Sequence, residues 1–86
     1  MKSKIKQVYL CLDKSGMAVG HAVETSDNVL IGTRPGATRK TMHECAADMQ
    51  KAFNKSPLEH AMLLKDAIIM DENSYHELLD SFTQII

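Results

Sequence analysis

The first third of the chain alternates between apolar and polar positions with the two-residue period of β-strands. Residues 8–13 are apolar on both alternating faces, which is typical of a strand that is covered on both sides. Residues 17–24 alternate cleanly, and residues 29–33 form a third apolar run after a turn at residues 25–28. Gly16 supplies the tight turn between the first two runs. This pattern predicts a three-stranded antiparallel meander with its first strand in the middle of the sheet.

The two faces of the predicted second strand differ in the size of their side chains. One face carries the larger ones, namely Met17, Val19, His21 and Val23. The other carries mostly small ones, namely Ala18, Gly20, Ala22 and Glu24. A face of small residues lets a helix approach a sheet closely, so we expect a helix on that side.

Beyond Arg34-Pro35-Gly36 the spacing of apolar residues changes to the 3.6-residue period of an α-helix. The helical stripe consists of Met42, Cys45, Ala46, Met49, Ala52 and Phe53. Thr41 and Glu44 have the spacing of a capping box at the start of this helix, with Thr38 as the alternative start. Asn54 and Pro57 mark its end.

Residues 55–66 allow more than one conformation. Residues 67–70 have the β-branched content and polar flanks of a short buried strand. We favour one or two helical turns near residues 57–63 before that strand. A continuous helix and a hairpin about Lys65 and Asp66 stay open as alternatives.

A second apolar stripe with helical spacing follows Asp71, which is a good N-cap residue. The stripe consists of Tyr75, Leu78, Leu79, Phe82, Ile85 and Ile86. It predicts a closing amphipathic helix and therefore a single α+β domain over residues 1–86, with the order β-β-β-α-β-α. Because a helix joins the third strand to the fourth, the fourth should lie parallel beside the first, with both helices packed on the sheet.

Composition excludes some classes of protein. A hydrophobic share of 44% is enough for one core, and no apolar run approaches the roughly 20 residues that span a bilayer. The Lys-rich start leads into a strand and not into a signal peptide, so we expect a cytoplasmic protein without membrane contact. Cys11 and Cys45 lack partners at metal-ligand spacing and are predicted to be two buried thiols.

Charge is divided unevenly along the chain. Residues 1–43 carry seven basic and three acidic groups, or +4, and residues 44–86 carry three basic and eight acidic groups, or −5. Such asymmetry can steer a partner or favour contact between copies. If the basic groups formed a patch at one edge of the sheet, with Tyr9 to stack a base, the nucleic-acid contacts would be Lys4, Lys6, Arg34, Arg39 and Lys40.

Three short stretches resemble the ribonuclease H-like fold, whose first two thirds share the predicted element order. Leu12-Asp13-Lys14-Ser15-Gly16 is similar to the family's first-strand aspartate and the turn after it. Met42-His43-Glu44 is similar to its helix-borne glutamate, and Met70-Asp71 to its fourth-strand aspartate. The same partial fold is similar to the small domain of HicB-type antitoxins, which bind a toxin, self-associate and are not nucleases. Residues 67–79 resemble a strand and helix of Phd/YefM-type antitoxins.

The ribonuclease H-like resemblance implies that Asp13, Glu44 and Asp71 bind two divalent metals for attack on a phosphodiester. Helical geometry argues against Glu44 as a metal ligand. At ~100° per residue it lies about 140° from the centre of the apolar stripe, so its side chain should point to solvent and away from Asp13. Asp48 is nearer, at about 100° from the stripe. Without the resemblance, Asp13 is explained as a turn residue and Asp71 as a helix cap.

The other reactive side chains do not form a familiar motif. Four histidines lie too far apart for a local metal site and are predicted to be on the surface: His21, His43, His60 and His76. Ser15 is not part of a G-x-S-x-G elbow, and Cys45 has no base within the same helical turn except the outward-facing His43. The glycines do not form a phosphate-binding loop. The sequence therefore predicts neither a metal nor a cofactor.

We expect a small non-enzymatic protein that binds another protein, of the regulatory or inhibitory kind found in phages and mobile elements, such as antitoxins and anti-defence proteins. Phe82, Ile85 and Ile86 form the expected interface, because an apolar terminus needs cover from the sheet, a second copy in a homodimer, or a partner. The alternatives are a metal-dependent ribonuclease H-like phosphodiesterase and a weak nucleic-acid-binding protein.

Overall fold

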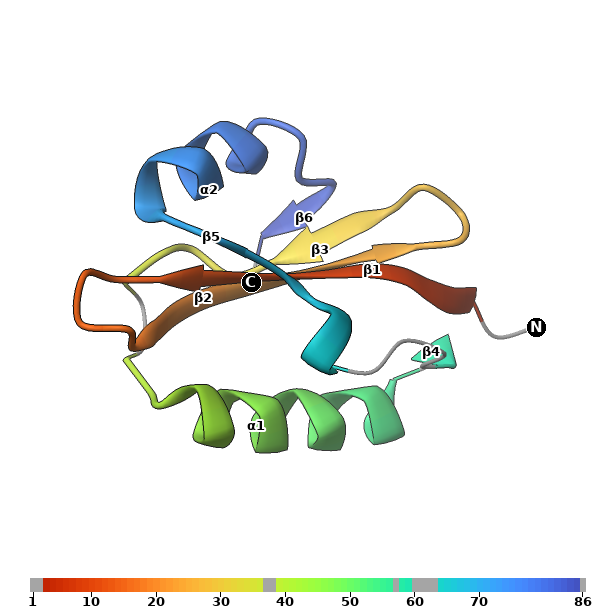
Figure 1. Cartoon of the computed structure of the whole chain (residues 1–86). Helices are drawn as coiled ribbons and strands as arrows, with labels where there is room; N and C mark the ends of the chain where they lie inside the picture. Colours follow the sequence, from red (N-terminus) through yellow and green to blue (C-terminus); the bar gives the residue numbers. More distant parts are fainter. Residues whose placement is uncertain (1–2, 37–38, 57, 60–63, 86) are drawn as a thin grey trace.

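The computed structural model describes residues 3–36, 39–56, 58–59 and 64–85. Its helices are α1 (Met42–Lys55), α2 (Glu72–Leu79) and the single 3₁₀ turn η1 (Leu64–Asp66). Its strands are β1 (Ser3–Leu12), β2 (Ala18–Thr25), β3 (Leu30–Gly32), β4 (Leu58–Glu59), β5 (Ile68–Met70) and β6 (Gln84–Ile85). The α+β class is confirmed (Figure 1).

The six described strands form one mixed sheet. β1, β2 and β3 pair antiparallel in chain order, so the predicted meander is confirmed. The long strand β1 is central, as predicted: β2 lies on one side of it, and β4 and β5 pair in parallel with its other side. The parallel placement of the fourth predicted strand, β5, is therefore confirmed as well.

The two helices cover opposite faces of the sheet (Figure 1). The cluster on the α1 face is buried and consists of Ile5, Val8, Leu10, Ala18, Val23, Cys45, Met49 and Phe53. The cluster on the α2 face consists of Cys11, Val19, Ala22, Leu30 and Tyr75. Both faces of β1 are thus buried, which explains why residues 8–13 are apolar at almost every position.

The predicted alternation along β2 is wrong at its first two residues. The pairing with β1 shifts between Cys11↔Gly20 and Leu12↔Ala18, so Val19 is an extra residue in β2. This bulge turns Ala18 toward α1 and Val19 toward α2, the reverse of the expected faces. The small face predicted farther along the strand is confirmed, because a Cβ added at Gly20 would lie 3.0 Å from Cε2 of Tyr75 in α2.

Helix α1 begins where the capping-box signature places it. The backbone N–H of Glu44 donates to Oγ1 of Thr41 at 3.1 Å, which satisfies one free amide of the first turn. The helix ends at Lys55, just before Ser56. The alternative start at Thr38 lies outside the described residues.

The predicted closing helix is wrong beyond Leu79. The chain turns at Asp80 and Ser81, and residues 84–85 form β6, which pairs in parallel with β3. The N–H of Thr83 donates to the carbonyl of Leu30 at 2.7 Å. Pairing with an exposed sheet edge satisfies these backbone groups and outweighs the helical spacing of the apolar residues.

Two other boundaries differ from the prediction. β1 begins at Ser3 and not near residue 8, because Ile5 is buried between exposed Lys4 and Lys6. Leu58 and Glu59 form β4 beside Ser3 and Lys4, so they are not helical. The rest of the helical turns predicted for residues 57–63 lies outside the described residues.

No helix within the described ranges is both long and apolar enough to cross a membrane.

Candidate functional site

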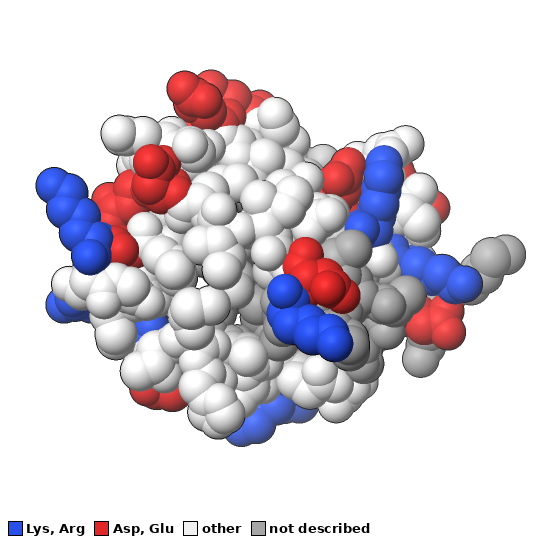
Figure 2. Space-filling view, viewed as in Figure 1, with Lys and Arg blue, Asp and Glu red and all other residues white. Residues whose placement is uncertain are grey.

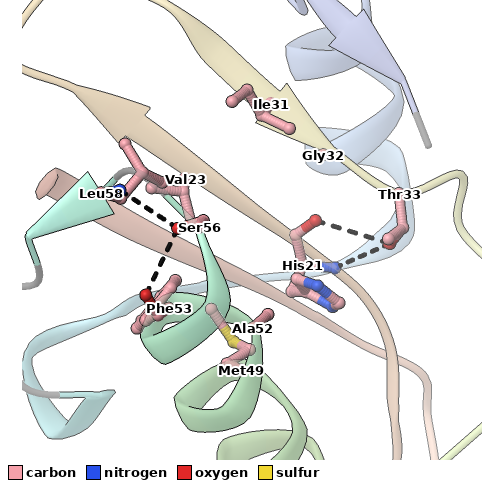
Figure 3. Close-up of a pocket in the computed structure, with 10 residues that line it drawn as sticks. All are labelled: His21, Val23, Ile31, Gly32, Thr33, Met49, Ala52, Phe53, Ser56 and Leu58. Atoms are coloured by element: carbon pink, nitrogen blue, oxygen red, sulfur yellow. Dashed lines mark hydrogen bonds between the residues drawn. The ribbon is translucent and has the colours of Figure 1, made fainter. Parts of the chain in front are cut away.

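A pocket of about 250 Å³ opens on the α1 face, between the helix and strands β2 and β3 (Figure 3). Its apolar walls are Val23 from β2, Ile31 from β3, and Met49, Ala52 and Phe53 from α1. Helix α1 packs mainly against β1 and β2, and the pocket lies beside that contact. The pocket therefore exposes apolar groups that belong to the edge of the core.

The hydroxyl groups that line this pocket are occupied by hydrogen bonds within the chain (Figure 3). Oγ of Ser56 donates to the carbonyl of Phe53 at 3.3 Å and accepts from the N–H of Leu58 at 3.2 Å. Oγ1 of Thr33 accepts from the backbone N–H of His21 at 3.1 Å. A group that enters the pocket would therefore contact apolar side chains and one imidazole ring.

That imidazole belongs to His21, which is half-buried, so its predicted surface position is wrong. Burial holds the pKa of His21 below its ordinary value of 6.5, because removal from water disfavours the charged ring, and the charge of Lys40 acts in the same direction. The carboxylate of Asp48 acts in the opposite direction but has the smaller effect. At pH 7 the ring is therefore neutral.

Strand β5 presents a second apolar surface. Ile68 and Ile69 are 45% and 53% exposed, and only Met42 is comparable among the large hydrophobic residues that the structure describes. β5 was predicted to be a short buried strand: its strand conformation is confirmed, but its burial is wrong. The reason is topological, because among the described strands only β1 pairs with β5.

Asp13 and Asp71 lie at the same end of the sheet and line one open pocket together with Glu72. Each aspartate also has a local structural role. Oδ1 of Asp13 accepts the N–H groups of Ser15 and Met17, both at 2.9 Å, and thereby closes the turn after β1. Oδ1 of Asp71 accepts the N–H of Ser74 at 2.8 Å and caps α2.

These contacts stabilise both carboxylates in the charged form. The backbone N–H groups of Met17 and Ser15 and the Arg39 guanidinium, whose Nε lies 3.0 Å from Oδ2, lower the pKa of Asp13. The Ser74 contacts lower the pKa of Asp71. Both groups are acceptors at neutral pH, as a metal ligand must be.

The third residue implied by the resemblance does not join them. Glu44 is exposed at the start of α1, where its Oε1 accepts from the Thr41 hydroxyl at 3.1 Å, and it does not line the pocket of Asp13 and Asp71. Asp48 pairs with Lys40. In the described parts of the chain, no three His, Cys, Asp or Glu residues are grouped so that they could hold a metal ion.

The five basic residues proposed for nucleic acid do not gather at one edge. Lys4 and Lys6 flank Ile5, which pairs with Thr25 at one end of the β1–β2 ladder, whereas Lys40 bridges Ala18 at the far end of β2. Arg34 is exposed beyond β3. Three of the five are paired with acids, namely Lys6 with Glu24, Arg39 with Asp13 and Lys40 with Asp48. Figure 2 shows the same mixture, with Lys and Arg interleaved with Asp and Glu around an uncharged centre.

The two cysteines are free and buried, as predicted. Burial, reinforced by the charges of Glu72, Asp71 and Asp13, raises the pKa of the Cys11 thiol to about 11. Burial also raises the pKa of the Cys45 thiol. Both therefore stay protonated near pH 7 and are poor nucleophiles.

Phe82 and Ile85 of the predicted interface at the end of the chain both make contacts within the chain. Phe82 is half-buried and packs edge to face on Tyr75, with 5.6 Å between ring centroids, so the sheet and α2 cover it. The backbone of Ile85 pairs with β3. Ile86 lies outside the described residues.

Sequence reasoning missed the two surfaces that now stand out. The pocket combines residues from two strands and a helix, and its only sequence signal was His21 on the same face of β2 as Val23. For β5, the signal was the pair of adjacent isoleucines, whose side chains point to opposite faces of the strand. Large apolar groups on both faces of an edge strand indicate a surface that something else covers.

Comparison of the chain with protein-family models, with curated proteins and with solved structures found no match.

Proposed function

We propose that this chain is a non-enzymatic, cytoplasmic protein-binding module of the regulatory or inhibitory kind, comparable in role to an antitoxin. The observation that carries the proposal is the apolar pocket between α1, β2 and β3, which is open at the surface of a small domain. The partner would be a protein that inserts one apolar side chain, such as Leu, Met or Phe, into this pocket.

Size favours a side chain over a free ligand. Small-molecule sites in proteins commonly measure about 300–1,000 Å³, and the pocket, at about 250 Å³, is smaller. A buried aromatic or aliphatic anchor that fills a pocket near the centre of an interface is the usual hot spot of protein–protein binding. The pocket therefore suits a protein anchor better than a cofactor.

Chemistry favours an apolar anchor. The hydroxyls of Thr33 and Ser56 are occupied within the chain, and the ring of His21 is neutral at pH 7. A charged side chain entering the pocket would lose its hydration without gaining an opposite charge there. An uncharged, apolar group meets no such penalty.

The proposal predicts that closing the pocket abolishes partner binding. In Ala52→Arg, a long side chain on an exposed position of α1 would occupy the pocket mouth, and we expect the partner's Kd to rise by at least about tenfold, in the range of a lost hot spot. The partner would be captured from the native host with the wild-type chain as bait. Its affinity for each variant would then be measured by calorimetry with purified proteins.

The matched control is Ala47→Arg, because Ala47 is also an exposed alanine of α1 but does not line the pocket. It should bind the purified partner as tightly as the wild type does. Equal binding by Ala52→Arg would contradict the proposal, and so would the absence of any protein that the wild-type chain binds reproducibly.

A ribonuclease H-like phosphodiesterase is the second candidate, because Asp13 and Asp71 line the same pocket at the ends of two parallel strands. It predicts cleavage of RNA or RNA–DNA hybrids with Mg²⁺ or Mn²⁺ that is lost in Asp13→Asn and Asp71→Asn. Asparagine keeps an oxygen for the turn and cap hydrogen bonds, so these variants should stay folded. Glu44→Gln is the control and should cleave normally, and the lack of metal-dependent cleavage by the wild type would eliminate this candidate.

A further inference from the structure

We propose that His21 regulates the pocket beside α1: the pocket accepts an apolar anchor while the imidazole ring is neutral and releases it when the ring is protonated. This inference rests on the proposed function, because it concerns the regulation of the same pocket. Of the ten described residues that line the pocket, only His21 titrates, and its ring is half-buried there (Figure 3). A change in its charge therefore changes the wall that an anchor contacts.

The pocket offers a protonated ring no unpaired opposite charge. The charged groups that face the ring are Lys40, from the segment before α1, and Asp48, from α1, and they are paired with each other. The hydroxyls of Thr33 and Ser56 are occupied by backbone groups. A protonated His21 therefore depends on water in the open pocket for its hydration.

The other described elements around His21 bring no further charge to its ring. In β1 the residue opposite His21 is Leu10, and β3 places only uncharged residues in the pocket. From α2, the Tyr75 hydroxyl reaches the backbone carbonyl of His21 at 2.8 Å, and its pKa of about 12 keeps it uncharged. Asp48 stays charged in mild acid, because its hydrogen bond with Lys40 lowers the pKa of Asp48.

An apolar anchor and a proton therefore compete for the pocket. Filling the pocket removes the water around the His21 ring, and loss of hydration disfavours the charged form. The occupied pocket thus binds the proton less tightly than the empty one, and by linkage the protonated pocket binds the anchor less tightly. Acid weakens binding, and it does so below the ordinary histidine value of 6.5, because burial and Lys40 lower the pKa of His21 in the free chain.

Toluene, which corresponds to the side chain of phenylalanine, tests this competition without a protein partner, since apolar cavities in proteins bind molecules of this kind. Its binding to the full chain is measured from the NMR shifts of Met49 and Ala52 at about pH 7.5 and about pH 5, the range in which histidine changes charge. We expect the Kd to be about three- to tenfold higher at the lower pH, because the affinity can change by up to about tenfold per pH unit below the His21 pKa. The dispersion of the amide spectrum checks that the chain stays folded.

His21→Gln tests the assignment to this ring, because glutamine is polar but does not titrate. Whatever its affinity for toluene, this variant should show the same Kd at both pH values. Lys40→Gln should raise the pKa of His21 and move the loss of binding to higher pH, because the ring then faces Asp48 without the competing cation. Lys65→Gln removes the same charge from an exposed site before β5 and should leave the pH dependence unchanged.

The imidazole signals of the wild-type chain report the same equilibrium from the side of the proton. Saturation with toluene should lower the pKa of His21, measured from the NMR shift of its ring Cε1–H group, because affinity and proton binding are reciprocal. The ring signal of His76, which is exposed on α2 and does not line the pocket, is the internal control for general effects of toluene.

Equal toluene affinity of the wild type at the two pH values, or a His21 pKa that toluene does not change, would overturn the inference and leave the proposed function in place. A pH dependence that persists in His21→Gln would also overturn it, because another group would then be responsible. Absence of toluene binding at both pH values would overturn it as well, whereas the proposed function would still be decided by the partner's affinity for Ala52→Arg.

Discussion

Tyr75→Ala is expected to lower the free energy of unfolding by about 3–5 kcal/mol, which is the usual loss for a buried aromatic residue. Tyr75 is fully buried at the centre of the α2-face cluster, with its ring against Gly20 on one side and Phe82 on another. Removing the ring leaves a cavity that the hydrogen-bonded sheet cannot collapse to fill. Because the total free energy of unfolding of natural domains is about 5–15 kcal/mol, the urea concentration at the unfolding midpoint should fall strongly.

Tyr75→Phe distinguishes the contribution of the hydroxyl group to stability from that of the ring. The hydroxyl oxygen lies 2.8 Å from the carbonyls of both His21 and Thr33, and its single hydrogen can be donated to either or shared between them. Burial raises the pKa of Tyr75 to about 12, so the hydroxyl remains a donor over the working pH range. Leaving the Thr33 carbonyl without this donor should cost about 1–3 kcal/mol, whereas the His21 carbonyl still accepts the backbone N–H of Thr33 at 3.0 Å.

Tyr9→Phe is the matched control for that hydroxyl. The Tyr9 hydroxyl donates to Oε1 of Glu24 at 3.2 Å from a half-buried position where water can replace it. Its removal should therefore cost less than the removal of the Tyr75 hydroxyl. If Tyr75→Phe were as stable as the wild type, the hydrogen bonds that join α2 to His21 of β2 and to Thr33, just after β3, would not contribute to folding.

Gly32→Ala is expected to destabilise the fold by about 1–3 kcal/mol through overpacking. A Cβ at position 32 would lie 2.5 Å from Cε2 of Phe82 and 2.9 Å from Cβ of Ala22. Ala22 is part of the sheet and cannot move away, so the Phe82 ring and the β6 segment behind it must shift. Equilibrium unfolding of Gly32→Ala, Phe82→Leu and the double variant measures the coupling between the two sites.

The expected coupling is favourable, because the leucine side chain of Phe82→Leu lacks the ring atoms that meet the new methyl group. The second substitution should therefore restore part of the stability lost in Gly32→Ala, and the contact with Ala22 should account for the rest. Equal destabilisation by Gly32→Ala in both backgrounds would show that Phe82 does not pack over β3 as described.

The parts of the fold that were predicted correctly are those in which local pattern and tertiary pairing agree. The meander follows from alternating residues and glycine-containing turns, and α1 follows from its stripe and the Thr41–Glu44 capping box. The parallel position of β5 follows from chain order, because a helix joins it to the meander. That position also places Asp13 and Asp71 at the same end of the sheet.

The parts that were missed depend on contacts between distant segments. β4 and β6 are two residues long and exist because β1 and β3 offer free edges, which no local pattern reveals. The Phe82–Ile85 segment keeps helical spacing, yet its backbone pairs with β3. The bulge at Val19 is a shift in the pairing between β1 and β2, and the alternation of residue types along β2 gives no sign of it. A pocket assembled from three elements is likewise invisible before those elements are placed.

The position of the two cysteines has a consequence for the environments in which the protein can fold. Cys45 lies in the cluster under α1 and Cys11 in the cluster under α2, so the sheet separates the two sulfur atoms. An internal disulfide would require the sheet to open, and both protonated thiols react slowly with oxidants. The native fold should therefore be equally stable in the presence and absence of a reductant such as glutathione.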